Sequence, residues 1–379
     1  MNLENKPSHI TRVEILNWCG KERISIPFEE RVTFLTGING SGKSSMLNVI
    51  FDSLVGNPKE HQKPSTSKHR FWGSNLIFNK GVSSQTLILP YAQLEKIDKE
   101  VDELLEKRDF FDLELLKSIQ AVHEYGDSDG SVSFIDFDIT PKGEQWRKSI
   151  SQEERFDEEI ENYLTSKSLG FIFQEDRKAL HNSEEISSGS PFYQYAYSSS
   201  IDSRLAFIRD AIQVRESQLN KRQLQEFRKV NEDNNILDIV NSNEFKSISK
   251  SLNEIEKVIE TLNDYFKESG KCIARDDDNK ITLGIIQGDE SEAKLICWHL
   301  LSRGEKTLIY LFLSVYFYKD RVLAFLLDEP EISFHVNWQK NLVRDLSEIA
   351  PSNQFIIATH SPSLVMNGWL GNCLDLKGM

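Results

Sequence analysis

The sequence predicts an α/β fold, a sheet covered by helices, and three observations support this class. The segment Gly37–Ser44 fits the pattern G-x-x-x-x-G-K-[ST] at every fixed position. The mostly apolar run 31–36 before it is typical of a buried strand, and residues 45–51 after it read as the first turns of a helix. A second apolar run, 322–327, ends in two adjacent carboxylates, at the end of a strand where ligands bind in an open α/β sheet.

The glycine loop carries the groups that a bound nucleotide phosphate requires. Its glycines allow backbone N–H groups to turn inward around phosphate oxygens, and the start of the following helix adds partial positive charge. Lys43 is placed to reach the β- and γ-phosphates, and Ser44 can offer its hydroxyl to Mg²⁺. We therefore predict that ATP and Mg²⁺ bind here. The predicted nucleotide-binding residues of the loop are Gly37, Asn39, Gly40, Ser41, Gly42, Lys43, Ser44 and Ser45.

Length and composition narrow the class of protein. The 379 residues, 39% of them hydrophobic, can bury a sizeable core in roughly two or three units. The N-terminus lacks the apolar segment of a secretory signal, and the longest apolar run, near 308–318, is far shorter than the ~20 residues of a membrane span. The four cysteines are scattered without a C-x-x-C pair. These features predict a cytoplasmic protein without membrane contact.

The charge argues against non-specific nucleic-acid binding. The formal net charge is −14, and residues 91–180 carry most of the acidic excess. A local basic surface is still compatible with this total. The loop 57–72 holds Lys59, Lys63, Lys68 and Arg70, and reads either as a solvated loop or as a contact for a partner or DNA. The sequence therefore leaves DNA binding open.

Alternating or apolar runs predict the strands of the first half of the chain. We expect strands at 10–18, 23–28, 32–35, 75–78, 86–89, 131–139 and 170–173. Between them, apolar residues from Leu94 to Leu115 recur at helical spacing, and 153–164 reads as an acidic helix. Residues 183–200 are rich in Ser and Gly and should be irregular.

The second half begins with two long helical segments, at 202–230 and 235–266. The second carries apolar residues at alternating spacings of four and three, namely Ile248, Leu252, Ile255, Ile259, Leu262 and Phe266. This seam fits a short antiparallel coiled-coil hairpin, and it fits equally an ordinary amphipathic pair packed on the domain. Strands are then expected at 280–287, 322–327 and 354–358.

The carboxylates after the strand 322–327 complete the predicted site. Asp328 would hold Mg²⁺ with Ser44, and Glu329 would be the general base that polarises the attacking water. Gln174, after a short strand, would bridge the metal and that water. His360, after the last core strand, would contact the γ-phosphate. We thus predict Glu329, Gln174 and His360 as catalytic, and Ser44, Gln174 and Asp328 as metal ligands.

A second anion site is predicted at Leu301–Glu305, before the apolar helix 308–318. A serine and a glycine at a helix start favour an anion. Because the chain already has one phosphate loop, the economical interpretation is that Ser302 and Gly304 bind nucleotide held by another subunit.

The order of these motifs resembles the ABC-type ATPases, in the branch of SMC, RecF and OLD proteins. Leu-Ser-Arg-Gly-Glu-Lys from Leu301, Asp-Glu-Pro-Glu-Ile-Ser-Phe-His from Asp328 and Ala-Thr-His-Ser-Pro from Ala358 are similar to OLD-related (AAA15-like) ATPases of bacterial anti-phage systems such as PARIS and Septu. Arg303 departs from the glycine found in many signatures. The helical hairpin lies between Gln174 and the signature, where SMC-like proteins insert their coiled coil.

The resemblance implies an ABC-ATPase head with an inserted helical hairpin. Its lobes would be 1–200, with an acidic helical insertion at about 91–165, and 271–379, with the hairpin at 201–270. Two such heads would form a head-to-head homodimer, or a higher oligomer, with composite ATP sites.

The resemblance also implies a role in anti-phage defence. The ATPase would sense infection, through a phage-encoded trigger, and regulate a separate toxic effector such as a nuclease. The chain ends about 19 residues after His360, so we expect the effector to act in trans. The alternative is a RecF- or SMC-like ATPase of DNA repair or chromosome maintenance, which would need a basic track over the head. A transporter subunit fits poorly with the hairpin.

Overall fold

The computed structural model describes ten stretches of the chain. They are residues 6–18, 21–54, 72–90, 132–137, 144–152, 157–165, 168–174, 201–228, 236–286 and 293–376. The loop 57–71, the apolar series from Leu94 to Leu115 and the Ser/Gly-rich stretch 183–200 lie outside these residues, so the predictions made for them stay predictions.

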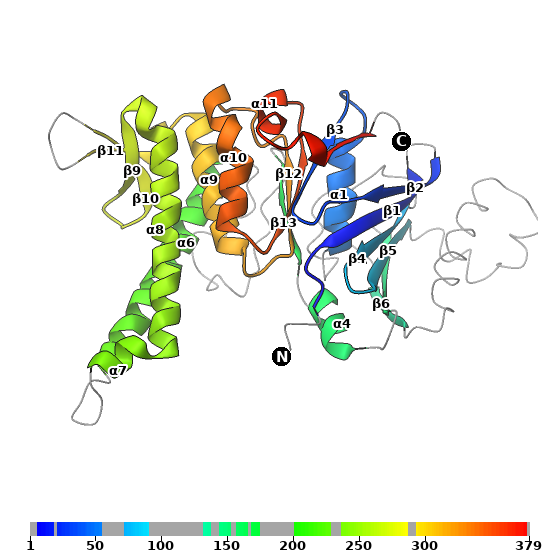
Figure 1. Cartoon of the computed structure of the whole chain (residues 1–379), viewed down its shortest axis with the longest axis horizontal. Coiled ribbons are helices and arrows are strands. Elements are labelled where there is room, and N and C mark those ends of the chain that lie inside the picture. Colours follow the sequence, from blue (N-terminus) through cyan, green and yellow to red (C-terminus); the bar gives the residue numbers. More distant parts are fainter. Residues whose placement is uncertain are drawn as a thin grey trace, which may run out of the picture. The chain divides into compact units, whose positions relative to one another are not determined.

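Two compact units are present, and each combines segments that are distant in sequence (Figure 1). The first comprises Met1–Gln174, Arg321–Pro330 and Ser352–Met379, and the second comprises Glu175–Asp320 and Glu331–Pro351. The lobe boundaries at 200 and 270 stay a prediction. No helix in the described stretches is both long and apolar enough to cross a membrane.

A five-stranded parallel sheet forms the core of the first unit and confirms the predicted α/β class. Its strand order is β14-β3-β13-β12-β8, with every neighbouring pair parallel. The strands are β3 (Val32–Thr36), β8 (Gly170–Phe173), β12 (Ala324–Asp328), β13 (Gln354–Ala358) and β14 (Cys373–Asp375). The almost fully buried β12 and β13 read as continuous apolar runs because both faces of a parallel sheet are covered.

Helix α1 (Lys43–Leu54) packs between this sheet and a second, antiparallel one. The second sheet has the order β2-β1-β4-β5-β7-β6. Its strands are β1 (Ile10–Trp18), β2 (Lys21–Pro27), β4 (Trp72–Phe78), β5 (Val82–Pro90), β6 (Val132–Phe137) and β7 (Glu144–Gln152). The apolar side chains of α1 are buried almost completely, which fixes the helix that follows the glycine loop. The first unit also contains α4 (Glu158–Thr165), α11 (Pro362–Val365) and the 3-10 turn η6 (Leu370–Asn372).

Strand β7 was not predicted, because it buries a lysine. Lys148 is 1% exposed, and its Nζ donates to the carbonyl oxygens of Ser53 and Leu164, each at 3.1 Å. These two carbonyls belong to the last turns of α1 and α4, where a cation favours the helix end. Burial lowers the pKa of Lys148 to about 7.

The second unit contains the predicted pair of long helices. They are α6 (Ile201–Phe227) and α8 (Asn243–Phe266), with the short α7 (Ile236–Asn241) between them. In Figure 1, α6 and α8 run side by side as a hairpin with α7 at its tip. The predicted helix 235–266 is broken because Ser242 caps α8, accepting a hydrogen bond from the backbone N–H of Phe245 at 3.1 Å.

The remaining elements of the second unit surround one end of this hairpin. They are η4 (Lys267–Ser269), β9 (Lys271–Arg275), β10 (Ile281–Ile285), β11 (Lys294–Ile296), η5 (Trp298–Leu300), α9 (Arg303–Tyr318) and α10 (Val336–Ile349). The three strands form an antiparallel sheet of order β11-β10-β9.

The two halves of the helix pair differ in burial, and the coiled-coil interpretation stays a prediction. Toward its C-terminal end, α8 contacts β9, α9 and α10, and Ile255, Leu262 and Phe266 are buried there. Toward the tip, Leu224 of α6 is 61% exposed and Leu237 of α7 is 63% exposed. The hairpin is therefore packed on the unit at its base and projects beyond it at its tip.

Candidate active site

The glycine loop is shaped by backbone conformations that only glycine adopts easily. Gly37 and Gly42 have φ values of +139° and +94°. A Cβ atom on Gly42 would lie 2.7 Å from the Trp18 indole, and one on Gly37 would lie 3.3 Å from the Asp375 carboxylate. The loop is thus enclosed by the end of β1 and by β14.

Lys43, the first residue of α1, folds back over this loop. Its Nζ donates to the carbonyl oxygens of Gly37 at 3.1 Å and Ile38 at 3.2 Å, and the residue is 5% exposed. Burial lowers the pKa of Lys43, and the carboxylates of Glu329 and Asp328 partly offset this shift. The ammonium group therefore lies where phosphate oxygens would take the place of these carbonyls as acceptors.

The three predicted metal ligands are in direct contact. Ser44 Oγ donates to Asp328 Oδ1 at 3.1 Å, and Gln174 Nε2 donates to Asp328 Oδ2 at 3.0 Å. The parallel register of β8 and β12 explains the second contact, because Phe173 lies opposite Leu327 and the next residues are Gln174 and Asp328. The two strand ends therefore deliver the amide and the carboxylate to one point.

This group of oxygen atoms fits Mg²⁺, the ion that the motifs imply. A hydroxyl, a carboxylate and an amide carbonyl are hard donors of the kind that Mg²⁺ prefers. Among the described atoms, Gln174 Oε1 is buried and has no hydrogen-bond partner, and the same is true of Ser41 Oγ in the loop. An unpaired buried acceptor destabilises the fold by about 1–3 kcal/mol, so a metal ion or hydrogen-bond donor that contacts it would remove this penalty. Burial raises the pKa of Asp328, although the bonds from Ser44 and Gln174 oppose that shift.

Glu329 occupies a strained backbone conformation next to these ligands. Its φ of +47° is in the left-handed region, which is unfavourable for a residue with a Cβ atom. Its backbone N–H donates to the carbonyl of Ala358 at 2.8 Å, which ties it to the end of β13. The carboxylate Oε1 lies 3.6 Å from Nε2 of His360, and both side chains are about one-third exposed. Water can therefore reach a carboxylate that stands beside an imidazole.

All of these groups belong to the first unit and lie at the same edge of the parallel sheet. The glycine loop follows β3, Gln174 follows β8, Asp328 ends β12, and His360 follows β13. Side chains at this edge can cradle an anion, hold a metal ion and accept a proton from water. The structure thus brings together the residues predicted for the loop, the metal and the catalytic groups, while their roles stay predictions.

Ser302 and Gly304 belong to the second unit, where they form the start of α9. Ser302 Oγ accepts from the backbone N–H of Glu305 at 3.3 Å, and the Glu305 carboxylate accepts from the Ser302 N–H at 2.8 Å. This is a capping box. A Cβ atom on Gly304 would collide with the carbonyl oxygen of Ser333, so close packing also requires this glycine.

Two neighbours of the glycine loop were missed from the sequence. Trp18 ends β1 and contacts Gly42, and Asp375 in β14 lies beside Gly37. The three-residue β14 pairs with β3, and Thr36 Oγ1 donates to the carbonyl of Leu374 at 3.2 Å. No local pattern marks either residue, because both contacts depend on pairing between distant strands.

A family model matches most of the chain. The model of the family described as "AAA domain, putative AbiEii toxin, Type IV TA system" matches residues 32–367. "Endonuclease GajA" of Bacillus cereus (strain VD045) is 39% identical over 57 residues, which are 15% of this chain and 10% of that protein's length.

Solved structures of Smc heads also match along the chain. One is the Smc head bound to the C-terminal winged-helix domain of ScpA, with a TM-score of 0.43, 16% identity, and coverage of 95% of this chain and 92% of that one. Another is an Smc head with an extended coiled coil, bound to the C-terminal domain of ScpA derived from Pyrococcus furiosus. Its TM-score is 0.39, with 16% identity and coverage of 95% and 91%.

Proposed function

Because this chain belongs to the AAA-domain family described with the putative AbiEii toxin of type IV toxin–antitoxin systems, we propose that it is a Mg²⁺-dependent ATPase. The observation that carries the proposal is the contact of Ser44, Gln174 and Asp328 beside the glycine loop. The Ser44 hydroxyl of α1, the Asp328 carboxylate at the end of β12 and the Gln174 amide just after β8 meet there, next to a buried lysine. No other role accounts as simply for a buried amide oxygen left without a partner.

The site residues of the first unit have separate roles in ATP hydrolysis. The loop N–H groups and Lys43 hold the β- and γ-phosphates of ATP. Ser44, Asp328 and Gln174 hold Mg²⁺, which when bound neutralises charge on the phosphate oxygens. Glu329 accepts a proton from water as the water oxygen attacks the γ-phosphorus and the bond to the ADP oxygen breaks. His360, whose Nε2 lies 3.6 Å from the Glu329 carboxylate, contacts the γ-phosphate.

ATP also joins two copies of the chain. The start of α9 places Ser302 and Gly304 at a helix N-terminus, where partial positive charge favours an anion, and the first unit already supplies one complete loop for the same phosphates. We assign Ser302 and Gly304 to the nucleotide of the second copy. Two composite sites then form in a head-to-head homodimer.

The closed dimer controls a separate toxic effector in anti-phage defence. The family description names a putative toxin, and the short match to an endonuclease supports an association with nucleic-acid cleavage. Nucleotide can control a partner only if the partner binds the open and closed states with different affinities. The hairpin, which projects beyond the unit at its tip, offers a surface for that partner.

The experiment that tests this proposal measures ATP affinity and turnover in the purified chain. Lys43→Ala should lose nucleotide binding, since it removes the ammonium group from the loop. Lys80→Ala, which changes a lysine of the same unit in the turn between β4 and β5, is the matched control and should behave as wild type. Turnover that survives Lys43→Ala would contradict the proposal.

The effector is tested by co-expression with the neighbouring gene product. Toxicity should require both proteins and should depend on Lys43. Toxicity of this chain alone, unaffected by Lys43→Ala, would contradict the regulatory role.

A further inference from the structure

Both ends of the helical hairpin are joined by ion pairs to the first turn of α9. The chain enters the hairpin at α6, whose first turn contains Asp202, and leaves it through β9, whose first residue is Lys271. Lys306 Nζ lies 2.6 Å from Asp202 Oδ1, and Lys271 Nζ lies 2.5 Å from Glu305 Oε1. Each end of the hairpin therefore contacts a different charged residue of the same helical turn.

Glu305 and Lys306 in turn hold the backbone of the segment His299–Ser302, here called the signature turn. The second oxygen of Glu305 accepts from the Ser302 N–H at 2.8 Å. Lys306 Nζ donates to the carbonyl of His299, also at 2.8 Å. Glu305 is 6% exposed and Lys306 is 7% exposed, so little solvent screens these bonds. Each residue thus bonds the hairpin on one side and the signature turn on the other.

The protonation of Glu305 reflects this double bonding. Burial opposes ionisation of its carboxyl group, but the hydrogen bonds from Lys271 and Ser302 outweigh burial and lower the pKa of Glu305. The carboxylate is consequently charged at neutral pH and can accept both bonds at once.

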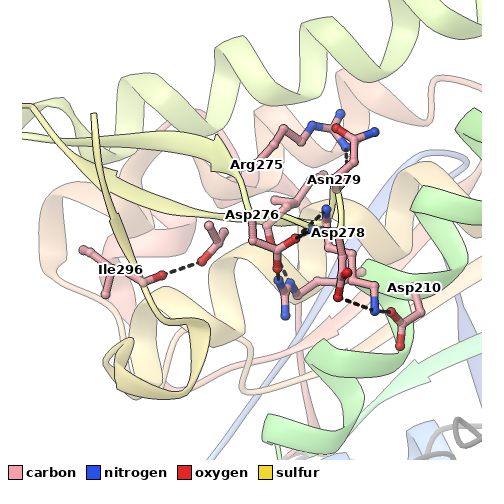
Figure 2. Close-up of polar contacts among 10 residues, drawn as sticks. Asp210, Arg275, Asp276, Asp278, Asn279 and Ile296 are labelled. Carbon is pink, nitrogen blue, oxygen red and sulfur yellow. Dashed lines mark hydrogen bonds and ion pairs between the residues drawn. The ribbon is translucent and has the colours of Figure 1, made fainter. Parts of the chain in front are cut away.

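Three ion pairs join the base of the hairpin, which we call the hairpin root: residues 202–216 of α6 together with β9, β10 and the turn between them. Arg209 pairs with Asp276 at 2.5 Å, Lys280 with Asp210 at 2.7 Å, and Arg275 with Glu216 at 2.6 Å. Figure 2 shows the contacts of Asp210 and Asp276 at the turn between β9 and β10.

One side chain of each pair is almost buried, since Arg209, Asp210 and Glu216 are 3%, 9% and 9% exposed, while their partners are 25–30% exposed. Separating a pair would leave a largely buried charge without its partner. Displacement of the hairpin should therefore move α6, β9 and β10 together.

We propose that Lys271 and Asp202 are positioning residues for the signature turn, so that movement of the hairpin root controls whether Ser302 can bind phosphate. Loss of the Lys271 bond frees the Glu305 carboxylate to rotate away from the Ser302 N–H. Loss of the Asp202 pair frees Lys306 from the carbonyl of His299. A partner that bends the hairpin would then switch ATP-dependent closure on or off. This inference rests on the proposed role of Ser302 in binding nucleotide of a second copy.

The first test is independent of that role. Backbone amide exchange across residues 299–306 is measured without nucleotide in wild type, Lys271→Met, Asp202→Asn and Lys319→Met. Lys319 pairs with Glu254 at 2.7 Å and also joins α9 to α8, but at the other end of α9, so it is the matched control. Exchange should rise in the first two variants and stay at the wild-type rate in the control. Unchanged exchange in Lys271→Met overturns the inference.

The second test measures turnover and ATP affinity in the same variants. Lys271→Met should lower kcat by about tenfold or more, while ATP affinity of the first-unit loop stays unchanged. Lys271→Arg should recover turnover, because an arginine still donates to Glu305, and this variant shows that the position tolerates a change. Faster exchange with wild-type kcat overturns the inference. A wild-type protein that binds ATP and never hydrolyses it refutes the proposed function instead, and the positioning of the turn is then judged by exchange alone.

Discussion

Glu329 should be one of the few positions at which glycine is more stable than alanine. Its φ of +47° is left-handed, and this conformation costs a residue with a Cβ atom about 1–2 kcal/mol. Alanine keeps that cost, whereas glycine removes it. Glycine loses about 0.5–1 kcal/mol through its larger chain entropy in the unfolded state. Taking the middle of each range, the difference predicts that Glu329→Gly unfolds with a free energy roughly 0.8 kcal/mol higher than Glu329→Ala.

Urea unfolding without nucleotide measures this difference, with midpoints compared at equal slopes. Lys80, with a φ of +68° and no role in the site, should show the same preference for glycine. Lys257, an exposed residue within α8, should show the ordinary preference for alanine, by about 1 kcal/mol. A Glu329→Gly protein that is less stable than Glu329→Ala would refute the strain. Both variants should lose ATP turnover, because both lack the carboxylate.

Three further predictions follow from particular contacts. The pKa of Lys148 is about 7 in the folded chain and 10.5 in the unfolded chain, so the unfolded chain binds more protons between these two pH values. The free energy of unfolding should therefore rise with pH above 7, by up to about 1.4 kcal/mol per pH unit. Lys148→Met should remove that slope in urea unfolding at pH 7 to 9, and an unchanged slope would contradict the assignment. Gly304→Ala should lower the free energy of unfolding by about 1–3 kcal/mol, because its Cβ atom would clash with Ser333. Gly371→Ala is the control, since its Cβ atom would lie in open space. Equal urea midpoints for the two variants would count against close packing at Gly304. Mixing Lys43→Ala with Ser302→Arg should restore part of the ATPase activity, since one intact composite site forms per heterodimer, and proven heterodimers without activity would argue against sharing.

The local parts of the site could be predicted from sequence because each has a pattern of its own. The glycine loop needs a strand before it and a helix after it, and β3 and α1 provide both. The strand β12 is apolar throughout and ends at the carboxylate of Asp328. The contact of Gln174 with Asp328 follows from the two predicted strands that precede these residues, since parallel strands end at the same edge of a sheet.

The parts that were missed depend on distant contacts. Strand β7 lacks the usual alternation of apolar and polar residues, because the charged Lys148 occupies a buried position. Lys148 is bonded there to the carbonyls of Ser53 in α1 and Leu164 in α4, which are distant in sequence. The pairing of β14 with β3, which brings Asp375 to the loop, has no local signal in three residues. The left-handed backbone of Glu329 could not be predicted, because residues with a Cβ atom disfavour this conformation. The hydrogen bond from its backbone N–H to Ala358 accompanies it in the fold.

The behaviour of Glu329→Gln with ATP and Mg²⁺ tests the proposed ATPase mechanism most directly. The amide preserves the shape of the side chain but cannot accept a proton, so ATP should bind with wild-type affinity while hydrolysis is lost. The size of the protein in solution is then measured with ATP. We expect a stable assembly of at least two copies for Glu329→Gln, and no such assembly when Lys43→Ala is added. A Glu329→Gln protein that hydrolyses ATP at the wild-type rate would contradict the role of this carboxylate and the proposed mechanism with it.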